Sequence, residues 1–99
     1  MADQDLDPIV LQKLQILQEK KEEAVRNEDY DVAMELKQVC DNLKVMANDL
    51  MHLESRKIQA IDGEDFEAAK ILKSEILKLK KQIEIIDPHH PLNRNAHPS

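Results

Sequence analysis

The fold is determined by a pair of similar segments, KEEAVRNEDYDVAMELKQVCDNL at Lys21–Leu43 and KIQAIDGEDFEAAKILKSEILKL at Lys57–Leu79. The second segment begins 36 residues after the first. A sequence period in this range is typical of stacked helical units that bury their apolar faces against one another. Positions that keep the same residue include Ala24/Ala60, Glu28/Glu64, Asp29/Asp65, Ala33/Ala69, Leu36/Leu72, Lys37/Lys73 and Leu43/Leu79.

The composition also favours helices. The chain has 99 residues, of which 34% are charged and 2% aromatic, with a single glycine. This is typical of long amphipathic helices or coiled coil. The net charge of −6 argues against a nucleic-acid partner, because phosphate contacts require a surplus of Lys and Arg. The sequence contains no apolar run of membrane-spanning length, and a single Cys40 suits a reducing cytosolic compartment.

Three helices are predicted from the residues that begin and end them. Asp7 followed by Pro8 begins the first helix, since Asp caps free amide groups and Pro is tolerated at the first helical position. The stretch 30–62 contains neither Gly nor Pro and is predicted to be one long helix. The third helix should stop at Asp87, because Pro88 disfavours helix in the residue before it.

Apolar residues on each predicted helix alternate steps of three and four, the spacing of a seam that faces another helix. The seam positions are Val10, Leu14, Leu17, Lys21 and Ala24, then Ala33, Leu36, Cys40, Leu43, Ala47 and Leu50, and finally Ala69, Leu72, Ile76, Leu79, Ile83 and Ile86. Apolar residues off these seams, which could cover the third helix or a second chain, are Val39, Met46, Leu53, Ile58, Ile71 and Ile85.

The predicted fold class is all-α, with antiparallel coiled-coil hairpins, a long central helix and two repeats. Residues 1–7 are predicted to be a disordered leader, residues 8–86 the helical domain, and residues 87–99 a flexible tail containing Pro and His. The sequence leaves open whether the helices form a rod or a compact bundle and whether the chain is a monomer or a dimer. It also leaves open whether the chain is a fragment of a larger protein.

Each repeat is predicted to place a tight turn between its helices. Asn27 aligns with Gly63, and these residue types best tolerate the left-handed conformation that ends a helix. Asp29 and Asp65 are then predicted to cap the following helices, where the helix dipole favours negative charge.

The residues around the turns resemble the UVR motif, a short helical hairpin of bacterial excision-repair proteins and of an activator of a protein-arginine kinase. The resemblance extends over about residues 14–80. In the first copy Val32 replaces a small residue, so the second copy fits the motif more closely. It does so through Ala60, Glu64-Asp65-Phe66-Glu67-Ala68-Ala69, Leu72-Lys73 and Ile76. This resemblance implies an adaptor that docks onto a partner hairpin in DNA excision repair or protease regulation.

Two tandem copies with EDYD and EDFE at the turns also resemble the family of the centrosomal protein of 104 kDa. In that family such a coiled-coil segment lies between a jelly-roll domain and a tubulin-binding TOG domain. The resemblance implies a microtubule-associated scaffold at the centrosome, centriole and cilium, with centriolar or ciliary-tip partners. The cysteine pairs that accompany the motif in the kinase activator are absent here, which favours this interpretation over the bacterial one.

The candidate protein-interaction residues lie at the two turns. In one interpretation the aromatic rings anchor a partner, because aromatic residues dominate interface hot spots. In the favoured interpretation each ring covers the end of its own hairpin, packing on Ala24 and Val25 or on Ala60 and Ile61, and the acidic residues serve as helix caps. The candidate residues are Glu28, Asp29, Tyr30, Glu64, Asp65 and Phe66.

No catalytic, metal or cofactor site is predicted. The serines lack an adjacent base, and no glycine-rich phosphate loop is present. His89, His90 and His97 match no structural zinc spacing, and Cys40 is interpreted as a small buried apolar residue. We therefore expect a non-catalytic module that binds other proteins through its helix surfaces or self-associates as a dimer. We expect no cofactor, no nucleic-acid partner and no membrane partner.

Overall fold

The computed structural model describes residues 7–92 of the chain. Within this range the chain forms three helices and no strand: α1 at Pro8–Arg26, α2 at Tyr30–Asp62 and α3 at Phe66–Ile85. The predicted all-α class and the unbroken central helix are confirmed. Of the predicted leader only Asp7 falls in the described range.

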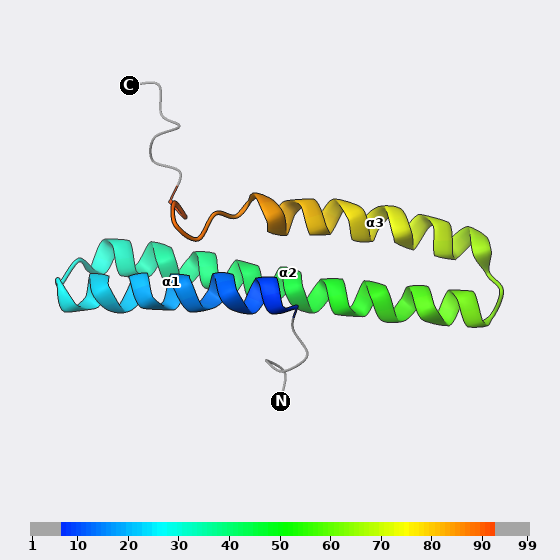
Figure 1. Ribbon diagram of the computed structural model, residues 1–99, viewed down its shortest axis with the longest axis horizontal. Helices are drawn as coiled ribbons and strands as arrows, with labels where there is room; N and C mark the ends of the chain where they lie inside the picture. The colour runs from blue at the N-terminus through cyan, green and yellow to red at the C-terminus, as the bar shows by residue number, and fades with distance from the viewer. Residues whose placement is uncertain (1–6, 93–99) are drawn as a thin grey trace, which may run out of the picture.

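The long helix α2 supports the other two. Helix α1 packs on the first half of α2, which we call the first hairpin, and α3 packs on the second half, which we call the second hairpin (Figure 1). The molecule measures 55 × 38 × 16 Å and has a radius of gyration of 16.6 Å. A compact chain of this length would have a radius of gyration of about 13 Å. Of the two shapes that the sequence left open, the structure is therefore the elongated one.

The buried core lies along the predicted seams. Leu17 and Leu43 have no exposed surface, and every other buried apolar side chain of the three helices also occupies a seam position. Burying a leucine contributes about 1.5–3 kcal/mol, so these seams supply most of the stability. The buried residues of the helices are Val10, Leu17, Ala24, Leu36, Cys40, Leu43, Ala47, Leu50, Leu72, Ile76 and Ile83.

The apolar residues outside the seams divide into two groups. Val39, Met46 and Leu53 are half-buried and pack against the core. Ile58, Ile71 and Ile85 are exposed, like other large apolar side chains along the second hairpin. The first group therefore belongs to the fold, whereas the second group is left at the surface.

Capping residues begin the helices as predicted. The Asp7 carboxylate accepts a hydrogen bond from the backbone N–H of Ile9 at 2.7 Å. The Asp29 and Asp65 carboxylates cap α2 and α3 by accepting bonds from the third residue beyond, at 3.4 and 3.2 Å. Such caps each contribute about 1 kcal/mol.

The chain after α3 turns and packs against the first hairpin. The backbone N–H of His89 donates to the Asp87 carboxylate at 2.9 Å, and that of His90 donates to the Asp87 carbonyl at 3.0 Å. Pro88 is buried, and Leu92 packs against the core. Residues 87–92 of the predicted tail therefore have a defined, non-helical path, while residues 93–99 lie outside the described range.

Candidate interaction surfaces at the helical turns

The turn between α1 and α2 is closed by two overlapping backbone hydrogen bonds. The N–H of Glu28 donates to the carbonyl of Val25 at 3.0 Å, and the N–H of Asp29 donates to the carbonyl of Ala24 at 2.8 Å. This pair of bonds defines a Schellman motif, which satisfies the free carbonyls at the end of a helix. Asp29 thus closes α1 with its backbone and caps α2 with its side chain.

The turn between α2 and α3 has the same construction. The N–H of Glu64 donates to the carbonyl of Ile61 at 3.0 Å, and the N–H of Asp65 donates to that of Ala60 at 2.8 Å. The two turns therefore place equivalent side chains in equivalent positions at opposite ends of the rod (Figure 1).

The left-handed residue of each turn is not the one that was predicted. Asn27 and Gly63 both have φ −87°, whereas Glu28 and Glu64 have φ 57° and 58°. In a Schellman motif the left-handed conformation falls on the residue after the helix cap, so the prediction was wrong by one position. A side chain costs about 1 kcal/mol in this conformation, and glycine would avoid that cost. Both turns nevertheless hold a glutamate there.

The aromatic rings are exposed, contrary to the favoured interpretation. Tyr30 is 58% exposed and Phe66 is 64% exposed. Each is the first residue of its helix, directly after the turn, where the preceding helix has already ended. Tyr30 does share a hollow with Val25, but this contact leaves most of the ring in solvent. The rings are therefore available to a partner.

An open apolar hollow lies beside Tyr30 at the end of the first hairpin. It has a volume of about 580 Å³ and lies between the last turn of α1 and the first turns of α2. Its apolar walls come from Val25, Tyr30, Ala33 and Met34, and Met34 is 70% exposed. Met34 was not among the candidate residues predicted from the sequence, and Val25 was named only as a packing partner of the ring. Their position beside the turn and off the seam was the signal that could have identified them.

The end of the second hairpin carries a related but less apolar surface. Ile61, equivalent to Val25, and Phe66 are both exposed, but Lys70 replaces Met34. Both ends are rich in negative charge, which favours a basic partner. The exposed acidic residues are Glu28, Asp29 and Asp31 at the first turn and Glu64, Asp65 and Glu67 at the second.

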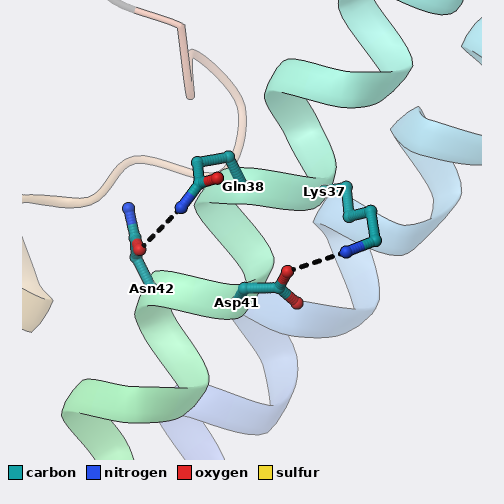
Figure 2. Close-up of polar contacts among 4 residues, drawn as sticks. All are labelled: Lys37, Gln38, Asp41 and Asn42. Atoms are coloured by element: carbon teal, nitrogen blue, oxygen red, sulfur yellow. Dashed lines mark hydrogen bonds and ion pairs between the residues drawn. The ribbon is translucent and has the colours of Figure 1, made fainter.

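A polar cluster on the exposed surface of α2 is a feature of the helix and not a second site. Figure 2 shows that Lys37 and Gln38 reach one turn along α2 to Asp41 and Asn42, at 3.0 and 3.1 Å. The hydrogen bond from Lys37 lowers the pKa of the Asp41 carboxyl. Exposed pairs at this spacing contribute about 0.3–0.5 kcal/mol to helix stability.

The described residues offer little further chemistry. Among residues 7–92 no group of three His, Cys, Asp or Glu side chains is placed to hold a metal ion, and none of the helices there meets the length and hydropathy of a membrane span. Burial raises the pKa of the Cys40 thiol, although the charges of Lys21 and Lys44 oppose this shift. Cys40 is 5% exposed, as expected for a core residue, and its thiol is kept protonated.

Comparison with protein families matches residues 12–45 to the UVR motif, described as the UvrB/uvrC motif. This range contains most of α1, the first turn and the first half of α2. The match therefore falls on the first copy, although the second copy fits the motif more closely by our interpretation of the sequence. Comparisons with curated proteins and with solved structures found no match. The motif is that of a helical hairpin and suggests a protein-interaction module.

Proposed function

We propose that this chain is a non-catalytic interaction and spacer module made of two UVR-like repeats that pack as antiparallel coiled coils. The observation that supports this most directly is the equivalent construction of the two turns. Each presents an exposed aromatic ring beside acidic side chains, at opposite ends of a rod 55 Å long. A rod with a binding surface at each end holds two partners at a fixed distance.

The glutamates in left-handed conformation support the same role. Strain that a chain retains in two equivalent turns is more common at functional sites than elsewhere. Here a glycine is present at position 63, one residue before the place where it would relieve strain. The turns therefore give up some stability and keep a negative charge next to each ring.

Our first candidate for the parent function is a scaffold of the centrosome and ciliary tip, with a cytoplasmic location and centriolar or ciliary-tip partners. The support for it is the tandem arrangement of EDYD and EDFE turns. The module would set the spacing of neighbouring domains and present its turns to these partners.

The second candidate is an adaptor of the bacterial UVR type, and the UVR match on residues 12–45 favours it. Its turns would dock onto a similar hairpin in a repair nuclease subunit or in a protease system. The two candidates share a binding surface and differ in the partner.

The test compares binding of the chain with that of a Tyr30→Ala/Phe66→Ala variant whose helicity is intact by circular dichroism. Two purified sets of probes are used: UVR hairpins of bacterial repair proteins, and centriolar proteins. We expect one set to bind the unmodified chain and the double variant to bind at least tenfold more weakly, because the rings supply the apolar anchors. The matched control is Val45→Ala/Leu77→Ala, which removes side chains that are 60% and 52% exposed but lie away from the turns.

Equal binding by the double variant and the control would show that the aromatic rings at the turns do not contribute to the interaction. Binding to UVR hairpins only would select the bacterial adaptor, and binding to centriolar proteins only would select the scaffold.

A further inference from the structure

The side of α3 that faces away from α2 is open and carries a shallow hollow. Helix α3 lies along one side of α2 (Figure 1), and its buried residues Leu72, Ile76 and Ile83 occupy the seam between the two helices. The hollow has a volume of about 350 Å³ and is lined by exposed residues of α3 alone. We call these residues the outer face of α3: Glu67, Lys70, Ile71, Ser74, Glu75 and Lys78.

The charge on this side of α3 changes sign along the helix. Glu67 lies in the first turn, directly after the acidic turn at Gly63, whereas Lys78 and Lys81 lie toward the other end. Lys81 extends the outer face, because residues three and seven apart share one side of a helix. None of these three side chains forms an ion pair within residues 7–92. Their charges are therefore free to pair with another molecule.

The same face of a second copy supplies these charges in the opposite order when the two helices run antiparallel. In a twofold dimer, a residue pair at the interface occurs twice, once in each direction. With Ser74 of both copies at the twofold axis, Glu67 of each copy lies at the level of Lys81 of the other. Serine is small enough for close approach of the helices. Ile71, which is 54% exposed, then packs on the aliphatic part of Lys78 of the other copy.

Helix α1 does not offer this match. Between residues 12 and 23 its exposed side chains are all neutral or acidic, so two antiparallel copies of α1 would bring no opposite charges together. The exposed residues in this range are Gln12, Gln15, Gln18, Glu19, Glu22 and Glu23. Charge complementarity therefore selects α3 as the helix that meets its own copy.

We propose that this chain forms an antiparallel dimer through the outer face of α3, in which Glu67 of each copy pairs with Lys81 of the other. The apolar contact is small, so the dimer is weak and depends on ionic strength. The contact does not require the aromatic rings at the turns, so it stands or falls separately from the proposed function.

The test is sedimentation equilibrium of the full chain at about 0.05–1 mM, a range suited to weak association. We expect the average mass to rise from monomer toward dimer, and less so when salt increases from about 0.05 to 0.5 M. Glu67→Lys and Lys81→Glu should each weaken association at least fivefold, because each brings like charges together at two symmetric places. Circular dichroism checks that both variants remain helical.

A mixture of the two charge variants gives the decisive result. In a pair made of one Glu67→Lys chain and one Lys81→Glu chain, opposite charges face each other at both places again. The mixture should therefore associate as strongly as the unmodified chain, although each variant alone does not. The two positions lie about 21 Å apart along α3, so a contact within one chain cannot restore the association.

A second pair of variants tests the apolar contact. Ile71→Ser should weaken association at least fivefold, because it removes the large apolar side chain of the outer face. The matched control is Val45→Ser, which removes a side chain of α2 that is 60% exposed, and it should associate normally.

Three outcomes would overturn the proposal. The first is a monomer at every concentration, and the second is a mixture of the charge variants that associates as weakly as either alone. The third is an equal loss from Ile71→Ser and Val45→Ser, since this would place the contact elsewhere on the rod.

Discussion

The two hairpins share much of their sequence but differ in the burial of some equivalent residues. Leu17 and Leu43 of the first hairpin are 0% exposed, whereas their equivalents Leu53 and Leu79 in the second are only half-buried. Ile86 and Leu92, which follow α3, pack against the core, and the segment that contains Leu92 contacts the first hairpin. Equivalent residues can therefore contribute differently to the free energy of unfolding when a segment distant in sequence packs on only one of the two hairpins.

The largest expected effect on stability comes from a matched pair of substitutions, each of which creates a cavity in one hairpin. Leu43→Ala should destabilise the chain by about 3–5 kcal/mol, since it removes a completely buried side chain. Leu79→Ala should cost about 1–2 kcal/mol, because part of that side chain already contacts water. Urea unfolding followed by circular dichroism measures both. Equal costs would show that the hairpins are equally packed.

A smaller effect is expected at the turns. Glu28→Gly and Glu64→Gly should each stabilise the chain by about 0.5–1 kcal/mol, because glycine adopts positive φ without strain. Thermal unfolding measures the change, and the two turns should respond alike since their hydrogen bonds are alike.

The control for the turn prediction is Gly63→Ala. A Cβ at Gly63 would lie 3.5 Å from the Gln59 carbonyl oxygen, an ordinary contact, and φ there is −87°. The free energy of unfolding should therefore change by less than about 0.5 kcal/mol. A large loss from Gly63→Ala, or from Glu64→Gly, would contradict the position that we assign to the left-handed residue.

The smallest expected effect is a pH dependence of the stability that comes from Cys40. It belongs to the first hairpin alone, since Ile76 occupies the equivalent position in the second. Burial raises the pKa of the Cys40 thiol in the folded chain above its value in the unfolded chain. The stability from the buried neutral thiol is therefore complete below the unfolded pKa of about 8.5 and is lost as pH rises through the folded pKa.

The stability difference between the unmodified chain and a Cys40→Ala variant should accordingly shrink between pH 8 and pH 10.5 in urea unfolding. The variant serves as the control for lysine titration, which affects both chains equally. A difference that stays constant over this range would indicate that the thiol is not desolvated in the fold.

Most of the local structure could be predicted from the sequence because its causes are local. Asp29 and Asp65 cap the helices that follow them, as their local sequence predicts. Helix α3 ends at Ile85, two residues before Asp87, where Pro88 was predicted to stop it. The seams followed from three-four spacing alone. The conformation of Glu28 and Glu64 could not be inferred from composition, because the preference of Asn and Gly for left-handed geometry pointed one residue too early.

The exposure of the candidate residues at the turns was not predicted. The acidic and aromatic residues at the turns were selected from their recurrence, yet we expected Tyr30 and Phe66 to cover the hairpin ends. Whether a ring is covered depends on how far the neighbouring helix extends past it, and this depends on where each helix stops in space. Met34 was missed for the same reason, since an apolar residue off the seam is ambiguous until its surroundings are known.

The sequence by itself determined the helices, their caps and the residues that face the core, because these depend on contacts within a few residues of one another. The elongated shape, in place of a compact bundle, and the return of Leu92 to the first hairpin emerged only from the three-dimensional packing. These contacts join residues far apart in the chain, such as Lys13 and Ile86. Their geometry depends on the packing of whole helices, which no local pattern encodes.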